Sequence, residues 1–208
     1  MGVLLLDASI VRKVLNVGGN TKEIPLPPWY AGWEHILLDI DPRGNPDVVC
    51  DARELRTLPE AEYDSVHCSH NLEHYYRHDV FKVLYGFLHV LKSDGFAFIR
   101  VPDIREVMRA VVEKDLDIDD VLYQSGMGPI KVHDVIYGHG GVIERSGNDF
   151  FAHKMGFTPK SLMEILRAAG FYKVGIMLVP NIFEIRAYAF KAEPSEYAMS
   201  LLGLSREG

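Results

Sequence analysis

The sequence has few cysteines, no long apolar run and no tract of one charge, and each absence excludes a class of protein. Cys50 and Cys68 are the only cysteines in 208 residues, and both fall in predicted core strands. This pattern fits reduced, buried thiols better than a disulfide framework. The longest apolar run near the N-terminus, Val3 to Leu6, stops at Asp7 with no cationic region before it, so neither a membrane span nor a signal peptide is expected.

Basic tracts are also missing. The chain has 22 Lys and Arg against 29 Asp and Glu, a formal net charge of −7, and its cations are scattered. A field of this sign repels a phosphate backbone. We therefore predict that the chain has no nucleic acid as a partner. The missing apolar run predicts that it has no membrane as a partner, and the reduced thiols predict that it is cytoplasmic.

Apolar residues, in contrast, are plentiful. They make up 48% of the chain, enough for one substantial core, which predicts a single domain over residues 1–208. Short apolar runs alternate with longer helical periods, a pattern typical of a doubly wound α/β fold with helices on both faces of the sheet. The predicted strands are residues 13–17, 36–40, 47–51, 63–69, 96–101, 172–179 and 184–191.

Helices are indicated by apolar spacing and by capping residues. Residues 79–91 carry apolar side chains three and four apart, and Asp94-Gly95 is expected to end that helix. Two further helices have recognisable caps. They are expected from Asp103, with Glu106 three residues on, to about Glu113, and from Thr158, with Pro159 next, to Gly170.

Three segments fit neither the apolar runs of a strand nor the apolar spacing of a helix. Residues 21–35 contain three prolines and cannot hold a full crossover helix. Residues 116–153 form a predicted loop-rich insertion, or lid, after the strand at 96–101, and residues 192–208 are predicted to be a frayed helix or disordered tail. An insertion at this place lies beside the carboxyl ends of the strands, where open α/β sheets bind ligands.

Polar residues at successive strand ends point to one crevice. Gly18-Gly19-Asn20 follows the first strand, where glycine allows close backbone approach to a ligand. Asp39 ends the second strand, where a carboxylate can accept ribose hydroxyls, and Asp51 ends the third, where it can meet an exocyclic amine. Together they predict an adenosine site without a pyrophosphate cradle. The alternative is that Asp39, Asp41 and Asp51 only cap loops.

The same residues belong to a longer ordered series of motifs. The series is Leu15–Asn20, Leu38–Asp41, Asp47–Ala52, Leu58-Pro59, Tyr63-Asp64, Ser69–His74, Leu91–Gly95, Val101–Asp103, His153-Lys154 and Ala169–Phe171. It resembles the small class I S-adenosylmethionine-dependent methyltransferases of the methyltransferase type 11 kind, from about Lys13 to Lys191. The resemblance implies S-adenosylmethionine as cofactor and a Rossmann-like seven-stranded sheet, mostly parallel with an antiparallel last strand.

The resemblance also implies roles for individual residues. Gly18 and Gly19 would approach the methionine moiety and Asp39 the ribose, while Asp51 and the amide of Ala52 would read the adenine. The implied cofactor-binding residues are Asn16, Gly18, Gly19, Asn20, Asp39, Asp41, Asp51, Ala52, Ser69 and His70.

The reacting end of the cofactor would lie near the fourth strand, flanked by Ser69 and His70. A sulfonium methyl group is already activated, so its in-line displacement needs mainly an aligned nucleophile and the exclusion of water. Where a general base is used, His74 and His153 are the candidates, because imidazole titrates near neutral pH. The predicted activity is S-adenosylmethionine-dependent methyl transfer.

The lid is predicted to bind the methyl acceptor, since loops on a rigid scaffold commonly carry specificity. Tyr137 and His139 are its candidate acceptor residues. Their chemistry suits O- or N-methylation of a polar small molecule or a glycan better than of a peptide. A homodimer is the assembly left open.

Three alternatives stay open. Asn16 stands where the family usually has an acid, so a non-catalytic protein that binds S-adenosylmethionine or S-adenosylhomocysteine remains a candidate. Residues His70 to His74 match the H-x-x-E-H pattern of zinc hydrolases, with Glu144 as a distant third ligand. That pattern belongs on a long helix, whereas here it follows a strand, so we assign no metal ligand. A dinucleotide is disfavoured, because the turn lacks G-x-G-x-x-G.

Overall fold

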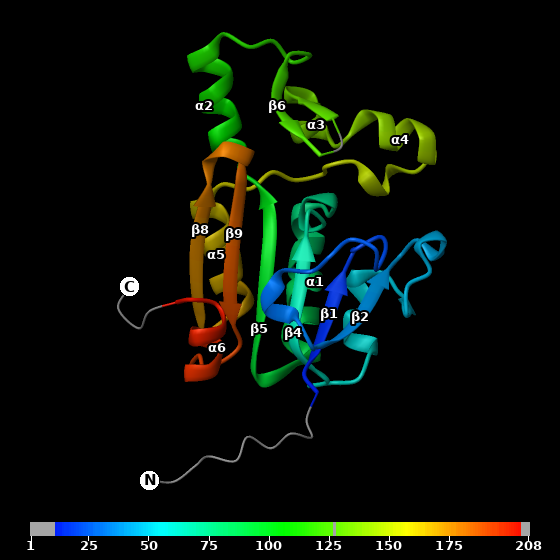
Figure 1. Cartoon of the computed structure of the whole chain (residues 1–208), viewed down its shortest axis with the longest axis vertical. Coiled ribbons are helices and arrows are strands. Elements are labelled where there is room, and N and C mark those ends of the chain that lie inside the picture. The colour runs from blue at the N-terminus through cyan, green and yellow to red at the C-terminus, as the bar shows by residue number, and fades with distance from the viewer. Residues whose placement is uncertain (1–10, 127, 205–208) are drawn as a thin grey trace.

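The computed structural model describes residues 11–126 and 128–204, and Figure 1 shows a sheet flanked by helices. The run from Val3 to Leu6 and the last four residues of the predicted tail lie outside the described residues. The strands of the main sheet are β1 (Lys13–Val17), β2 (Glu34–Asp39), β3 (Val48–Val49), β4 (Tyr63–Ser69), β5 (Leu91–Pro102), β8 (Lys173–Val179) and β9 (Glu184–Phe190).

These seven strands run in the order β3-β2-β1-β4-β5-β9-β8. Only β9 is antiparallel to its neighbours, β5 and β8, while the other pairs are parallel. The predicted doubly wound sheet, mostly parallel with an antiparallel last strand, is therefore confirmed. The strand order reverses between β1 and β4, which places a ligand crevice at their carboxyl ends.

The register of the central strands sets the geometry of that crevice. Val17 of β1 pairs with Leu38 of β2 on one side and with Cys68 of β4 on the other. The residue that comes next in each segment, Gly18 just after β1, Asp39 at the end of β2 and Ser69 at the end of β4, therefore lies at the same edge of the sheet.

The main helices are α1 (Arg77–Val90), α2 (Ile104–Lys114), α5 (Pro159–Ala169) and α6 (Glu196–Leu201). The predicted caps are present. The Asp103 carboxylate accepts from the Glu106 amide, and Thr158 forms a capping box with Ser161. Gly170 ends α5 with a φ of 106°, a conformation that favours glycine.

The predicted end of α1 at Asp94-Gly95 is wrong. Leu91 is fully buried and already pairs with Tyr63 of β4, so the chain enters β5 directly after Val90. The next registered pair is Phe96 with Ser65, and the three-residue excess on β5 forms an irregularity that contains Asp94-Gly95. The pattern read as a helix stop is therefore a bulge in a strand.

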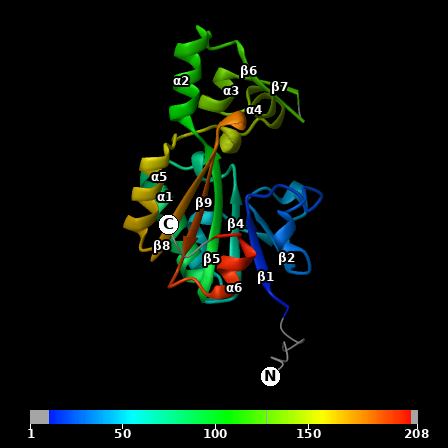
Figure 2. The same ribbon diagram turned by 60° about the vertical axis from the view of Figure 1, so that its left-hand side comes forward.

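The two faces of the sheet are covered differently. Figures 1 and 2 show α1 and α5 on one face and α6 on the other. No crossover helix follows β1, as predicted, and residues 21–33 supply only the 3₁₀ turn Pro28–Tyr30. That turn buries Tyr30, whose hydroxyl lies 2.8 Å from Ser65 Oγ.

Of the two alternatives predicted for the tail, a frayed helix or disorder, the structure shows a helix over residues 196–201, α6, and this helix is packed rather than frayed. Ala198 and Met199 are buried against Phe98 and Tyr188, in the cluster that also contains Tyr30. The helix forms because it covers apolar surface on a face that lacks a crossover helix.

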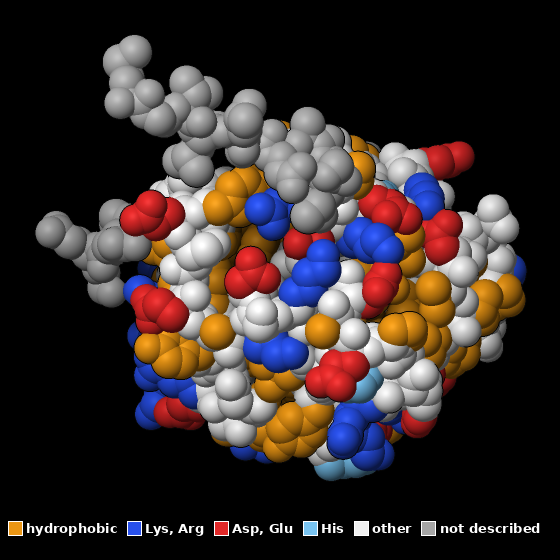
Figure 3. All heavy atoms as spheres, turned by 90° about the horizontal axis from the view of Figure 1, so that it is seen from below, with side chains coloured by type: hydrophobic (Ala, Val, Ile, Leu, Met, Phe, Trp, Pro, Cys, Tyr) orange, Lys and Arg blue, Asp and Glu red, His pale blue; other side chains and the backbone are white. Residues whose placement is uncertain are grey.

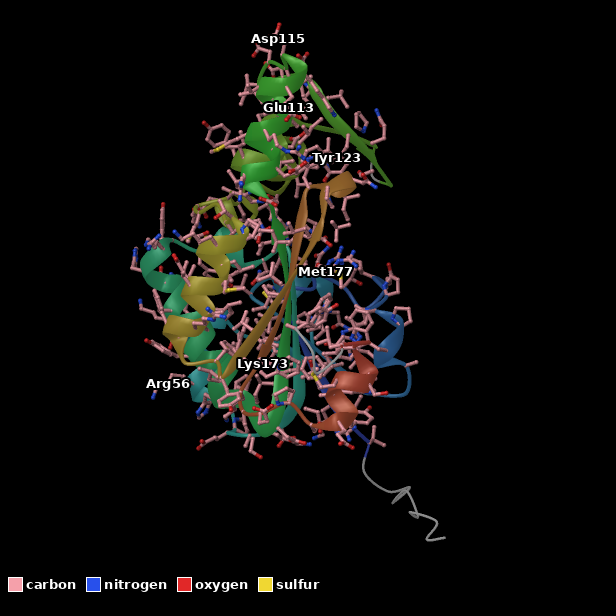
Figure 4. The ribbon with its side chains drawn as sticks, turned by 90° about the vertical axis from the view of Figure 1, so that its left-hand side faces the viewer. Arg56, Glu113, Asp115, Tyr123, Lys173 and Met177 are labelled. Atoms are coloured by element: carbon pink, nitrogen blue, oxygen red, sulfur yellow. The ribbon has the colours of Figure 1, made fainter. Side chains whose placement is uncertain are left out.

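The predicted loop-rich lid contains short regular elements. They are the hairpin of β6 (Val121–Ser125) and β7 (Gly128–Lys131), followed by α3 (Val132–Tyr137) and α4 (Gly140–Ser146). Figures 1 and 2 both place this segment at the carboxyl ends of the parallel strands. Figure 4 shows Tyr123 beside the turn between β8 and β9, where its ring centroid lies 5.6 Å from that of Phe183. The lid thus packs on the sheet through that turn.

The opposite end of the molecule has no single-sign patch in the view of Figure 3, where acidic and basic side chains are interspersed. Cys68 lies in β4 as predicted, whereas Cys50 lies just beyond the two-residue strand β3. Both thiols are free, and burial raises the pKa of Cys68. No helix in the described residues is long and apolar enough to cross a membrane.

Candidate functional site

A cavity of about 300 Å³ opens at the carboxyl ends of the strands, beneath the lid. The loops after β1, β2, β3 and β4 form its walls, and residues 149–154 close it from the lid side. The predicted site residues that line it are Gly18, Asn20, Asp39, Asp41, Asp51, His70 and His74.

The turn after β1 requires glycine at its first position. Gly18 has a φ of 70°, and a Cβ atom there would lie 2.1 Å from Asn71 Nδ2. The Gly18 amide donates to the Leu38 carbonyl at 2.8 Å. The turn therefore brings bare backbone to the cavity wall, directly beside the end of β2.

Gly18→Ala is therefore expected to lower the free energy of unfolding by roughly 1–3 kcal/mol, because the new methyl group adds strain at positive φ and contacts Asn71. Urea unfolding measures the loss. Gly175→Ala in β8 is the matched control, since that position has no atom within 4 Å of a built Cβ and no positive φ. A Gly18→Ala protein as stable as this control would contradict the described turn.

Asp39 is held at the cavity wall by two backbone amides. Its Oδ2 accepts from the Asn20 amide and its Oδ1 from the Asp41 amide, both at 2.9 Å. A carboxylate offers about two lone pairs on each oxygen, so each oxygen retains one. Two adjacent hydroxyl groups could donate to these remaining positions without displacing either amide.

The other two aspartates are paired within their own loops. Asp41 binds the Arg43 guanidinium and Asp51 binds that of Arg53. The hydrogen bonds from Arg43 lower the pKa of Asp41. Burial raises the pKa of Asp51, but the bonds from Arg53 outweigh burial and lower it. Both acids therefore cap loops, as the alternative interpretation proposed, and also line the cavity.

An apolar surface lies between these acids. Ile40 follows Asp39 directly, lines the cavity and leaves 38% of its surface exposed. An exposed isoleucine beside two carboxylates offers a flat ring both an apolar contact and acceptors for its amino group.

Four of the predicted cofactor-binding residues do not line the cavity: Asn16, Gly19, Ala52 and Ser69. Asn16 is buried, and its Nδ2 donates to His35 Nε2 at 3.2 Å. Burial lowers the pKa of His35, which keeps that nitrogen available as an acceptor. A Cβ on Gly19 would lie 2.2 Å from Asn16 Nδ2, so Asn16 supports the turn from beneath.

His70 joins the cavity to a buried charge network. Its side chain is 45% exposed, and its Nε2 lies 3.0 Å from Glu184 Oε2. Arg100 and Arg186 donate to the same carboxylate at 2.6 Å each. Burial raises the pKa of Glu184, but these partners outweigh burial and lower it to about 2. Partial burial likewise lowers the pKa of His70, yet the carboxylates of Glu184 and Glu73 raise it to about 9.

The two histidines predicted as bases lie together, with ring centroids 5.0 Å apart. Only His74 lines the cavity. His153 lies behind it and donates from Nδ1 to the Val135 carbonyl at 2.9 Å, and burial lowers its pKa.

The structure does not bring the predicted acceptor residues to the cavity. Tyr137 is 63% exposed, and neither it nor His139 lines the wall. The lid contributes Phe150, Phe151 and Lys154 instead. Lys154 belongs to a motif noted in the sequence, whereas the two phenylalanines carry no local signal that separates them from core residues.

Comparisons with solved structures place this fold. A S-adenosylmethionine-dependent methyltransferase from Archaeoglobus fulgidus is 19% identical with a TM-score of 0.55, over 87% of this chain and 86% of that one. A 1,6-didemethyltoxoflavin-N1-methyltransferase from Burkholderia thailandensis, solved with S-adenosylhomocysteine, is 18% identical with a TM-score of 0.52, over 88% and 72%. A S-adenosylmethionine-dependent methyltransferase from Methanosarcina mazei is 13% identical with a TM-score of 0.55, over 88% and 93%.

In sequence, no protein-family model and no curated protein matches the chain. The structural likeness alone shows that the chain has the fold of class I S-adenosylmethionine-dependent methyltransferases.

Proposed function

We propose that this chain binds S-adenosylmethionine in the cavity at the carboxyl ends of β1, β2 and β4 and transfers its methyl group to an oxygen or nitrogen of a small polar acceptor. The observation that carries the proposal is Asp39, held by two amides with one free lone pair on each oxygen, beside the bare backbone of Gly18. The fold of the solved methyltransferases supports it.

The cavity residues fit an adenosine group. Asp39 would bind both ribose hydroxyls, Ile40 would contact the adenine, and Asp51 would accept from its amino group while sharing a carboxylate with Arg53. The turn at Gly18 would approach the rest of the cofactor. No α-helix follows this turn within residues 18–33, which disfavours a dinucleotide because pyrophosphate binds at a helix N-terminus.

When bound, S-adenosylmethionine supplies a methyl group activated by the sulfonium charge. The protein must then align the acceptor and exclude water. Phe150 and Phe151 of the lid and Tyr76 of the opposite wall supply the apolar cover. The Lys154 ammonium lies 5.7 Å from the centre of the Tyr76 ring and joins the two walls.

A non-catalytic cofactor-binding protein is the second candidate. Asn16 favours it, because the amide is buried beneath Gly19 and brings no negative charge to the ammonium of the methionine moiety.

Calorimetric titration of the full chain with S-adenosylmethionine and with S-adenosylhomocysteine tests the proposal. We expect saturable binding of one molecule of each. Tritium transfer from labelled cofactor to a panel of phenols, sugars and amines then separates the two candidates, because only the enzyme labels an acceptor. Failure to bind either compound would reject both.

A further inference from the structure

A second cluster lies directly behind the cavity wall. Glu73, His74 and His153 come from two segments far apart in the sequence, and their ligand atoms all lie within 4.8 Å of one another. Two hydrogen bonds hold the segments together, because the Glu73 carbonyl accepts from the amides of Lys154 and Met155. The cluster is therefore fixed by backbone contacts as well as by side-chain packing.

The Glu73 carboxylate lacks hydrogen-bond donors. Its side chain is 1% exposed, and neither Oε1 nor Oε2 has a hydrogen-bond partner among the described residues. Its one ion pair there is with His70, whose Nδ1 lies 3.5 Å from Oε1, beyond the usual length of a hydrogen bond. A buried carboxylate in this condition is costly unless a cation lies beside it, and in the described residues His70 is the partner that balances part of its charge without donating a well-formed hydrogen bond.

The histidine nitrogens are arranged to meet such a cation. His153 donates its Nδ1 proton to the Val135 carbonyl, so Nε2 carries the lone pair. His74 has a carbonyl oxygen near each ring nitrogen, at 3.2 Å from Nδ1 and 3.0 Å from Nε2. A neutral ring donates to only one of them, so the other nitrogen becomes a ligand only when the ring turns its lone pair from that carbonyl oxygen towards the ion. Donation of one ring nitrogen to a carbonyl is the usual support of a metal-binding histidine.

We propose that Glu73, His74 and His153 bind a divalent transition-metal ion of the Zn²⁺ class. Two imidazoles and one carboxylate match the donors that zinc prefers, whereas Mg²⁺ and Ca²⁺ prefer oxygen ligands only. Zinc ligands lie about 2.0–2.2 Å from the ion, so shifts of about 1 Å in these side chains close the site.

The sequence pattern H-x-x-E-H includes Glu73 and His74 but implies a different set of ligands. In a zinc hydrolase the two histidines bind the ion and the glutamate acts as base, with a third ligand elsewhere. Here the glutamate itself is a ligand, and the distant ligand is His153 rather than Glu144, which lies exposed on α4.

The place of the ion suggests its use. His74 lines the cavity while Glu73 and His153 lie behind it, so an ion with three protein ligands would keep an open position at the cavity wall. An oxygen atom of the methyl acceptor would bind there. This role rests on the proposed function, whereas the ion site itself does not.

Titration of the chelator-treated full chain with ZnCl₂, without S-adenosylmethionine, tests the site. We expect one ion per chain, and we expect Glu73→Gln and His153→Gln each to weaken binding by at least about 100-fold. His133→Asn is the matched control, because that histidine also lies near two carboxylates, Asp119 and Asp134, but in the lid. This control is expected to bind like the unmutated protein.

A measurement on the unmutated protein covers the case in which a variant fails to fold. In ¹⁵N-histidine spectra, Zn²⁺ is expected to shift the ring nitrogens of His74 and His153 and to leave those of His133 in place. Three results would overturn the proposal. They are a lack of stoichiometric Zn²⁺ binding, full Zn²⁺ affinity in both Glu73→Gln and His153→Gln, and Zn²⁺-induced shifts in the ring nitrogens of His133 alone. In those cases protonated His70 balances the charge of Glu73, and the proposed cofactor site is unaffected.

Discussion

Asp39→Ala is expected to weaken the binding of S-adenosylhomocysteine by about 100-fold or more. The proposed site gives this carboxylate two ribose hydroxyls, and hydrogen bonds to a charged group contribute about 1.5–3 kcal/mol each. The substitution also removes the acceptor of the Asn20 and Asp41 amides, which order the turn. Calorimetric titration at matched buffer and temperature measures the change.

Two further variants separate charge from structure. Asp39→Asn keeps the shape and one acceptor oxygen, so it should retain more affinity than Asp39→Ala. Asp94→Asn is the control, because Asp94 is exposed and lies outside the lining of the cofactor cavity. Unchanged affinity in Asp39→Ala would contradict the assignment of the ribose to Asp39. The cofactor would then bind through other residues.

Glu184→Gln is expected to lower the free energy of unfolding by roughly 2–3 kcal/mol, which urea unfolding near pH 7 measures. Glu184 is 2% exposed and is bonded to His70, Arg100 and Arg186. Removing one member of a fully buried pair costs about 3–5 kcal/mol, and the partial exposure of both arginines reduces that figure.

The pH dependence of this effect has a fixed sign. The pKa of Glu184 is lowered to about 2 in the folded protein, below an ordinary value of about 4.3 in the unfolded chain. The difference in free energy of unfolding between the unmutated protein and Glu184→Gln is therefore fully present above the pKa of this glutamate in the unfolded chain. It decreases as the pH falls towards 2. Glu62→Gln, at the partly exposed pair with Lys13, should change stability by less than about 0.5 kcal/mol. Equal losses in both variants would contradict the buried network.

The parts of the fold that were predicted correctly depend on local sequence. The apolar runs of β1 and β4 have the predicted bounds, and α5 lies between the predicted caps at Thr158 and Gly170. The errors arise where tertiary contacts decide. Leu91 enters the sheet because it pairs with Tyr63. Residues 196–201 form a helix because they cover a sheet face that lacks a crossover helix.

The site residues likewise divide into those that local sequence predicts and those that tertiary contacts bring together. Asp39 and Gly18 could be found because Asp39 is the last residue of β2 and Gly18 immediately follows β1, and the register of these parallel strands brings them together. Glu184 and Arg100 are 84 residues apart in the chain and meet only through the antiparallel pairing of β5 with β9. The orientation of Asn16 towards His35 likewise depends on a neighbouring strand.

The cavity and the proposed ion site share one wall. His74 belongs to both, so the residues predicted as general bases gain a different explanation as ligands of an ion that faces the methyl acceptor. Methyl transfer to an acceptor without a metal-binding oxygen would then be insensitive to chelation.

A crystal structure of the full chain with S-adenosylhomocysteine tests the central claim most directly. The account predicts both ribose hydroxyls on Asp39, the adenine against Ile40, and the sulfur near the turn at Gly18. The ligand in any other pocket, or its ribose away from Asp39, would contradict it.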